Sequence, residues 1–513
     1  MTSMIRGTAA ATLAAATAAA VIAVPGTAVA APADTGNCPA LIALGVQGTG
    51  ESSPNADSTS DTGMLGEMFR PFQAGADAAG VPVHREYVPY DAGFGGFVPG
   101  GTSSYQTSVS GGTDRLSQTI ADKAQQCPGA RFALAGYSQG SHVVSLMAQE
   151  IGQGSGPVPA DRVAAVALFA DPTRTSGAAP FPGSDQQLGP EPAPGTSGQA
   201  ITAIADLAPS GASGGGIGPE RDRPADFGAL TGRVASFCSP GDLACDAPDK
   251  APLLRAVANV AGQAEFGGDP LRALASITQA LAFTGIKTFT NVVNQDISGN
   301  SLANLSLNPK KSISARIAEA SDPRTPVDPG KAIAALFKVG SIALNSAVTV
   351  ARTLLTPANI AEIAAAGLAN PVAGLAIFGT KLLGALPQII PPSTGTRLVQ
   401  QTFKAVVDNV TDNTDMLDLN TWVKYSEVIT RHASYANYPV TADGRSATQF
   451  VADWFVSAAR DSAESPVPVT EDTPGSSTGP DSPATPTTAP TSSPSTPAPW
   501  TFELQPSTAP AAP

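Results

Sequence analysis

Short apolar runs alternate with helical patterns along the first part of the chain, and this alternation limits the fold more than any other feature of the sequence. The apolar runs lie at residues 40–46, 132–135 and 163–170, and a more polar strand candidate lies at 83–88. The intervening helical patterns lie at residues 64–79, 104–126 and 140–152. Strands separated by helices form parallel sheets that helices cover on both faces. We therefore expect an α/β fold, a three-layer sandwich with a mostly parallel sheet.

A loop-rich excursion and a long helical stretch follow. Residues 172–230 are rich in Gly and Pro and predict a surface excursion, and 233–237 is a further short strand. From 250 to 425 apolar residues recur at helical spacing, which predicts an inserted α-helical unit and a candidate lid. Residues 363–380 carry no charge, but Gly, Asn and Pro interrupt them, so core or lid helices are favoured over a membrane span.

The last folded segment returns to the first pattern. Ser446 and Gln449 have the spacing of a capping box, and an apolar stripe follows that suits a helix covering a sheet. We therefore expect one α/β domain in two parts, residues 31–249 and 426–460, with the helical unit of 250–425 inserted between them.

The two ends of the chain predict export and disorder. Residues 1–30 carry one early Arg, an apolar stretch and Ala28-Val29-Ala30, which is the pattern of a signal peptide. Residues 461–513 have six acidic residues, no basic ones and dense Pro, Ser and Thr, so we expect a disordered tail. We expect a secreted, extracellular protein that is a candidate for association with the cell wall.

Charge and ligand chemistry narrow the function classes. The chain has 29 basic and 42 acidic residues, a formal charge of −13, so it lacks the basic footprint of a nucleic-acid binder. Its four cysteines, Cys38, Cys127, Cys238 and Cys245, can all pair in an oxidising compartment, in any of three connectivities. No Cys/His cluster has metal-ligand spacing, and we expect neither a metal nor a cofactor.

The chemistry concentrates in Gly136-Tyr-Ser138-Gln-Gly140. A strand leads into this motif and a helix leaves it, which is the setting of a nucleophile elbow. Flanking glycines are needed because a sharp turn leaves no room for Cβ atoms. The helix N-terminus adds N–H groups that can stabilise an oxyanion. Ser138 is therefore the candidate nucleophile.

A nucleophilic serine needs a base and an orienting acid. His432 is the best of three histidines because it precedes the final helix, where a loop at the sheet edge is expected, whereas His84 lies on a strand and His142 on the elbow helix. For the acid, Asp242 lies between Cys238 and Cys245, where a disulfide would rigidify the loop. Asp171, directly after a strand, is the competitor, and we interpret it as a loop-stabilising carboxylate.

These landmarks resemble the cutinase family of serine esterases, over about residues 36–248 and 426–460. The matching features, in chain order, are Cys38-Pro39, Gln47-Gly48-Thr49-Gly50-Glu51, Cys127 before the elbow, Phe169-Ala-Asp171-Pro172, and Cys238-x-x-x-Asp242-x-x-Cys245. The resemblance implies an α/β-hydrolase type of fold and a cutinase-like catalytic domain. This sequence departs from the family in placing 190 positions, filled by the helical unit, between Asp242 and His432.

The resemblance also implies roles for single residues. Ser138 would be the nucleophile, Asp242 the acid and His432 the base, with Thr49 and the Gln139 N–H as oxyanion donors. The implied disulfides are Cys38–Cys127 and Cys238–Cys245.

The expected function is a secreted carboxylic-ester hydrolase, a cutinase-like esterase or lipase acting on lipid or polyester esters. The helical insertion is a candidate for contact with lipid surfaces or the cell envelope. Two alternatives remain open, because a triad does not distinguish water from an alcohol as acyl acceptor. These are a cell-envelope acyltransferase with the same triad and a non-catalytic envelope protein.

Overall fold

The computed structural model describes residues 38–467 except for isolated positions and one interrupted segment. The omitted positions are 97, 99, 266, 268, 269, 355, 357, 360, 363–364, 366–376, 378–379 and 382–390. The predicted signal peptide at 1–30 and most of the predicted tail at 461–513 therefore lie outside the described residues, as does most of the uncharged segment 363–380.

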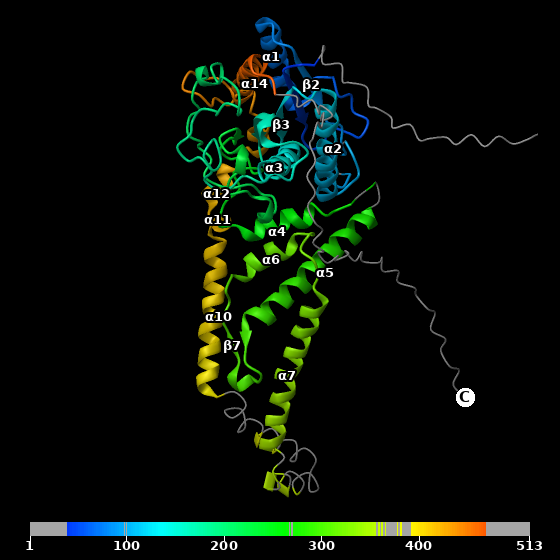
Figure 1. Cartoon of the computed structure of the whole chain (residues 1–513). Coiled ribbons are helices and arrows are strands. Elements are labelled where there is room, and N and C mark those ends of the chain that lie inside the picture. The colour runs from blue at the N-terminus through cyan, green and yellow to red at the C-terminus, as the bar shows by residue number, and fades with distance from the viewer. Residues whose placement is uncertain are drawn as a thin grey trace, which may run out of the picture. The chain divides into compact units, whose positions relative to one another are not determined.

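A five-stranded sheet forms the centre of the α/β domain (Figure 1). Its strands are β1 (Leu41–Val46), β2 (Val83–Tyr87), β3 (Arg131–Tyr137), β4 (Val163–Phe169) and β5 (Val234–Phe237). They lie in the order β2-β1-β3-β4-β5, and every neighbouring pair is parallel. The sheet is parallel because each strand pair is joined by a helix or a long crossover, which confirms the predicted fold class.

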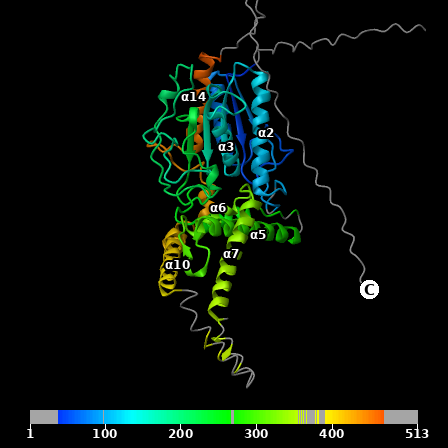
Figure 2. The same ribbon diagram turned by 60° about the horizontal axis from the view of Figure 1, so that its bottom comes forward.

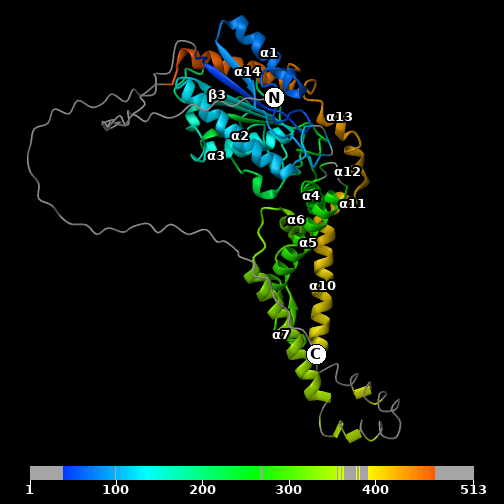
Figure 3. The same ribbon diagram turned by 90° about the vertical axis from the view of Figure 1, so that its right-hand side faces the viewer.

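Helices cover both faces of this sheet (Figure 3). On one face lie α1 (Gly63–Ala79) and α14 (Ala447–Glu464), and on the other lie α2 (Tyr105–Gln126) and α3 (Gln139–Gly152). Side chains alternate between the two faces along each strand, so Leu41 joins the α1/α14 core and Ile42 the α2/α3 core. Both faces of β1, β3 and β4 are buried, which explains why these strands are apolar runs, whereas the edge strand β2 is half-buried and more polar.

The strand register brings four carboxyl ends to one edge of the sheet. Val46 of β1 is level with Gly136 of β3, Tyr137 with Phe169 of β4, and Phe169 with Phe237 of β5. The loops that follow these strands therefore leave the sheet side by side. In open parallel sheets this edge is where ligands bind.

The excursion at 172–230 contains no strand or α-helix, but the prediction that it lies on the surface is wrong in part, because Phe181, Ile201 and Leu207 are buried in the core. It holds only three short 3-10 helices, at Ile201–Ala203, Glu220–Asp222 and Gly228–Leu230. Its Asp222 and Arg174 side chains are nevertheless buried, so the excursion is packed by polar contacts as well as by apolar ones.

The segment between β5 and α14 is mainly helical (Figure 2). Its helices are α4 (Pro252–Ala261), α5 (Pro270–Gln295), α6 (Ile313–Ser321), α7 (Pro329–Leu354), α10 (Pro392–Asp412), α11 (Thr414–Leu417), α12 (Leu419–Lys424) and α13 (Val428–His432). It also contains a small antiparallel pair that periodicity did not predict, β6 (Ile297–Ser298) with β7 (Ser306–Leu307). Gly299, with φ of 95°, begins the turn between these strands. We call residues 250–425 the helical unit.

The predicted capping box at the start of α14 is present. The Ser446 hydroxyl accepts from the Gln449 N–H, and the Gln449 side chain accepts from the Ser446 N–H. Phe450, Trp454 and Phe455 of this helix are fully buried against the sheet. Among the described residues, no helix combines the length and apolar character needed to cross a membrane.

Candidate active site

The Gly136–Gly140 segment forms a strained elbow between β3 and α3. Ser138 has φ of 54° and ψ of −118°, in a region that residues with a side chain rarely adopt. A Cβ atom on Gly136 would lie 2.6 Å from the Gly140 carbonyl oxygen, and one on Gly140 would lie 1.9 Å from that of Val46. Only glycine therefore fits at these two positions. This strained turn places Ser138 at the edge of the sheet where the strands have their carboxyl ends, directly before the N-terminus of α3.

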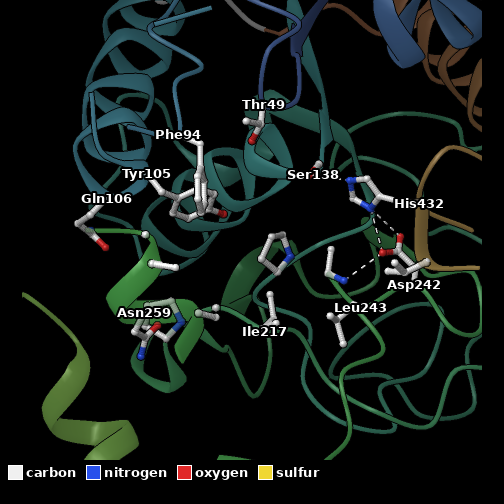
Figure 4. A pocket seen from close by; sticks show the side chains of 18 of the residues that line it. Thr49, Phe94, Tyr105, Gln106, Ser138, Ile217, Asp242, Leu243, Asn259 and His432 are labelled. Atoms are coloured by element: carbon white, nitrogen blue, oxygen red, sulfur yellow. Dashed lines mark hydrogen bonds and ion pairs between the residues drawn. The ribbon is translucent and has the colours of Figure 1, made fainter. Parts of the chain in front are cut away.

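The structure brings Ser138, His432 and Asp242 together. Nε2 of His432 lies 2.9 Å from the Ser138 Oγ, and Nδ1 lies 2.9 Å and 3.0 Å from the two carboxylate oxygens of Asp242. Figure 4 shows the His432 ring and the Asp242 carboxylate pointing toward one another. This chain of contacts allows the imidazole to take the serine proton while the carboxylate orients the ring.

The Asp242 carboxylate is fully buried and held by further donors. Its Oδ1 accepts from the Ala244 N–H at 3.0 Å, and its Oδ2 accepts from the Tyr435 hydroxyl at 2.6 Å. The disulfide Cys238–Cys245 closes the loop that presents Asp242, with a sequence separation of 7. The second disulfide, Cys38–Cys127, is also bonded as the resemblance implies.

Asp171, the competing acid, is engaged elsewhere. Its Oδ1 accepts from the Thr173 N–H at 2.8 Å, and the Thr173 hydroxyl lies 2.7 Å and 2.9 Å from its two oxygens. Burial raises the pKa of Asp171 to about 6, although the Thr173 bonds and nearby His142 oppose the shift. These contacts fit the interpretation of Asp171 as a loop-stabilising carboxylate.

The other two histidines are not part of this group. His84 on β2 lies 3.0 Å from the Glu86 carboxylate and is partly exposed. His142 on α3 is fully buried, with Nε2 2.9 Å from Asp222 and Nδ1 3.1 Å from the Tyr105 hydroxyl.

The two expected oxyanion donors flank Ser138. Gln139 begins α3, and its side chain accepts from the Thr49 hydroxyl at 3.3 Å, which ties the loop after β1 to the elbow. Thr49 lines the same cavity as Ser138. In this structure the Thr49 hydroxyl donates its one hydrogen to the Gln139 side chain, so the oxyanion role of Thr49 and of the Gln139 N–H stays a prediction.

Three supporting residues were not identified from the sequence as parts of the site. Glu51 accepts from the Gly48 N–H and from the first turn of α1, both at 3.1 Å, and so fixes the loop that carries Thr49. Burial raises the pKa of Glu51, although these N–H donors oppose the shift. Tyr137 donates to the His432 carbonyl at 3.0 Å, and its ring centroid lies 5.2 Å from the imidazole.

The third, Tyr435, supports the carboxylate. Burial, together with the charge of Asp242, holds the pKa of Tyr435 well above its usual value, so its hydroxyl remains a donor. The one sequence signal that could have suggested this role is the position of Tyr435 three residues after His432, because two side chains on one short segment can reach the same carboxylate.

A cavity of about 570 Å³ opens in front of Ser138. Its walls are mostly apolar and come from both parts of the chain, the α/β domain and the helical unit (Figure 4). From the α/β domain come Phe94, Tyr105, Ile217 and Leu243, and from the helical unit Ala258, Asn259, Ala261, Gly262 and Pro323. A cavity of this size and polarity can hold an aliphatic chain beside the serine hydroxyl.

Fold and site together define an α/β protein with a Ser-His-Asp triad at the carboxyl edge of a parallel sheet. Residues 38–256 match the family described as Cutinase, so this part of the chain is similar to the cutinase family. The match ends before His432, so the place of His432 in the site depends on geometry rather than on the family match.

Individual relatives agree with this family. The chain is 32% identical over 216 residues to "Carboxylesterase Culp6 homolog" of Corynebacterium glutamicum, covering 41% of this chain and 66% of that one. It is 40% identical over 72 residues to "Carboxylesterase Culp1" of Mycobacterium tuberculosis, covering 14% and 31%. The chain thus spans less than two thirds of the length of either relative. The solved catalytic core domain of acetyl xylan esterase from Trichoderma reesei is similar at 20% identity, 47% and 98% coverage, and a TM-score of 0.27.

Proposed function

We propose that the protein is a secreted carboxylic-ester hydrolase that acts through an acyl-serine intermediate. The observation that carries the proposal is the continuous contact from the Ser138 Oγ through His432 to the buried Asp242, with distances of 2.9 Å on both sides of the imidazole. The names of the two carboxylesterase relatives support it.

The proposed mechanism has two half-reactions. His432 Nε2 takes the Ser138 proton as Oγ attacks the ester carbonyl carbon, and the N–H of Gln139 and the hydroxyl of Thr49 stabilise the tetrahedral oxyanion. The intermediate collapses, the C–O bond to the alcohol breaks, and His432 returns its proton to the leaving alkoxide. Water then attacks the acyl-serine by the same route, which releases the acid and restores the Ser138 hydroxyl.

We propose esters with an aliphatic acyl chain as the substrate class. The cavity beside Ser138 is apolar, and an acyl chain placed in it would be removed from water at about 0.8 kcal/mol per CH₂ group. Because the helical unit supplies one wall, it would act as a specificity cap over the site.

The helical unit is also a candidate for docking on a lipid surface. Within the part of the chain that the structure describes, every exposed large hydrophobic side chain lies between Leu253 and Ile429. The two long helices α5 and α7 together contain five basic residues and no acidic one, in a chain with a formal charge of −13. Ile429 on α13, which directly follows the helical unit, is 84% exposed and lines the cavity, so exposed apolar surface also lies at the site itself. This combination favours an aggregated lipid as the occupant.

Export is part of the proposal. The pattern of residues 1–30 is that of a signal peptide, and two disulfides suit an oxidising compartment. N-terminal sequencing of the protein from its native culture supernatant should find a chain that starts near Ala31. A protein retained in the cell with residues 1–30 intact would refute export.

The activity test is hydrolysis of p-nitrophenyl esters from acetyl to palmitoyl, by the wild type and by Ser138→Ala. We expect hydrolysis by the wild type with an optimum above acetyl, and loss of at least about 10³-fold in the variant. Equal rates for both proteins would exclude Ser138 as the nucleophile. A wild type that transfers acyl groups to added sugar faster than to water would favour the acyltransferase instead.

A further inference from the structure

A group of charged side chains, three of them buried, lies beside the active-site cavity. It begins at His142, one helical turn after Ser138 on α3, which is 0% exposed. Nε2 of His142 lies 2.9 Å from Asp222, and the Tyr105 hydroxyl lies 3.1 Å from Nδ1. The arrangement fits a ring that donates from Nε2 and accepts at Nδ1. The triad uses none of these contacts.

Arg324 of the helical unit completes this group. Its guanidinium binds Asp222 in a bidentate manner, with distances of 2.8 Å and 2.7 Å to the two carboxylate oxygens. It also lies 3.2 Å from Asp322, which in turn is 2.7 Å from Arg221. Although burial alone would raise it, the hydrogen bonds from His142 and Arg324 lower the pKa of Asp222 to about 2. Asp222 is therefore a charged acceptor shared between the nucleophile helix and the helical unit.

The group is attached to the wall of the cavity on both sides. Pro323, which lies between Asp322 and Arg324, lines the cavity, and so does Tyr105 on the opposite side of His142. The Asn259 side chain also lines the cavity and donates to the Ser321 hydroxyl at 2.9 Å, which joins α4 to the end of α6. The position of this wall thus depends on where Arg324 is held.

From these contacts we infer that the Asp222–Arg324 pair fixes the helical unit against the nucleophile helix and thereby determines which acyl chains the cavity accepts. The inference deepens the proposed esterase function and depends on it for the substrate. Arg324 is a positioning residue, because it acts through Pro323 and the backbone around it. A bidentate ion pair with a buried carboxylate is a poor source of net stability but a strict geometric constraint, which is what a specificity-determining wall requires.

The test compares kcat and KM for p-nitrophenyl acetate and octanoate in the full-length protein. We expect Arg324→Met to lower the octanoate-to-acetate ratio of kcat/KM by about tenfold, mainly through KM for octanoate. Arg324→Lys keeps the charge but loses the bidentate geometry, so its ratio should fall less. The double variant Asp222→Asn/Arg324→Met leaves no unpaired charge at the site, so it replaces Arg324→Met if that single variant does not fold. Its octanoate-to-acetate ratio of kcat/KM should be as low as that of Arg324→Met.

Arg316→Met is the matched control. Arg316 lies on α6, eight residues before Arg324, and forms a more deeply buried pair with Asp296 at 2.5 Å, but it does not line the cavity. The ratio in this variant should stay within about twofold of the wild type. An unchanged ratio in Arg324→Met, or an equal fall in Arg316→Met, would overturn the inference.

Hydrogen exchange separates this inference from the proposed function. In Arg324→Met, amides of residues 313–326 should exchange faster than in the wild type and faster than in Arg316→Met, because the end of α6 loses its anchor. If the wild type hydrolyses neither ester, the esterase proposal fails, and hydrogen exchange alone then decides whether Arg324 anchors the helical unit. Equal exchange in the wild type and in Arg324→Met would refute this anchoring role.

Discussion

At the scale of single residues, the site depends on how a buried carboxylate is held and oriented. Asp242 is 0% exposed, and its two oxygens accept from His432, Ala244 and Tyr435. A buried carboxylate is costly unless donors surround it, and each donor also restricts its rotation. Orientation of the imidazole therefore depends on residues that never touch a substrate.

Tyr435→Phe tests this support. The hydroxyl donates to Asp242 at 2.6 Å, and hydrogen bonds to charged groups contribute about 1.5–3 kcal/mol, so we expect kcat to fall by about tenfold. Steady-state ester hydrolysis measures this, with Tyr438→Phe as control, because the Asp242 carboxylate is contacted by His432, Ala244 and Tyr435 rather than by Tyr438. Equal kcat in the two variants would show that Tyr435 does not position the carboxylate.

Asp171→Asn tests a buried carboxyl outside the triad. Its pKa in the fold, about 6, exceeds the ordinary value of an aspartate, about 4, so the folded protein binds the proton more tightly than the unfolded chain does. Wild-type stability should therefore fall as pH rises from about 4 to 6, by about 3 kcal/mol in total, and Asp171→Asn should lack this loss. Urea unfolding of both proteins between pH 3.5 and 7.5 measures the difference. A difference that is constant with pH would contradict this account of Asp171.

At the scale of elements, the two disulfides serve different ends. Cys38–Cys127 spans 89 residues, whereas Cys238–Cys245 spans 7 and encloses Asp242. Loop-closure entropy grows with the length of the closed loop, so the long disulfide should matter more for stability and the short one for the geometry of the site.

Paired Cys→Ser variants separate these roles. Without Cys38–Cys127 we expect a loss of about 4.5 kcal/mol in unfolding free energy with little change in kcat, and without Cys238–Cys245 a loss of about 2.5 kcal/mol with a clear fall in kcat. Denaturant unfolding and ester hydrolysis of each variant provide the two numbers. A kcat that falls only when Cys38–Cys127 is removed would show that the long disulfide, and not the short one, maintains the geometry of the site.

The strands and the elbow could be predicted from sequence because their signals are local. The strand at 163–170 is a continuous apolar run, and Gly136 and Gly140 flank Ser138 within five positions. Pairs distant in the chain carry no such signal. The 102 positions between Asp222 and Arg324 hide their contact, and β6 and β7 are too short to show a period.

The place of His432 was predictable only in part. Its position before the last helix suggested the sheet edge, but its distance from Asp242 along the chain, 190 positions, gave no information about contact. The contact follows from tertiary structure, because α13 and the start of α14 return the chain to the edge where the loop after β5 ends.

At the scale of the whole molecule, the exposed large hydrophobic side chains of the described residues lie between Leu253 and Ile429, almost all of them in the helical unit. Leu336 and Phe337 on α7 are 63% and 74% exposed, although both are among the apolar residues whose helical spacing predicted the helical unit. Large exposed apolar patches mark interaction sites. On the proposed function, the partner is the lipid that carries the ester.

Leu336→Gln/Phe337→Gln should weaken binding to lipid vesicles by at least about tenfold, since two large apolar side chains would no longer enter the lipid. Co-sedimentation with phosphatidylglycerol vesicles measures binding. The thermal midpoint and p-nitrophenyl acetate hydrolysis should stay unchanged, because both residues are exposed and do not line the cavity. Vesicle binding equal to that of the wild type would exclude this face of α7 from docking.

Covalent labelling tests the central claim most directly. A p-nitrophenyl alkylphosphonate reacts with a serine that an imidazole activates, and peptide mass spectrometry locates the adduct. We predict one alkylphosphonyl group on Ser138 in the wild type, and labelling at least about 10³-fold slower in His432→Gln, whose side chain cannot act as the base. An unlabelled Ser138 in the oxidised wild type, or equally fast labelling in His432→Gln, would contradict the triad.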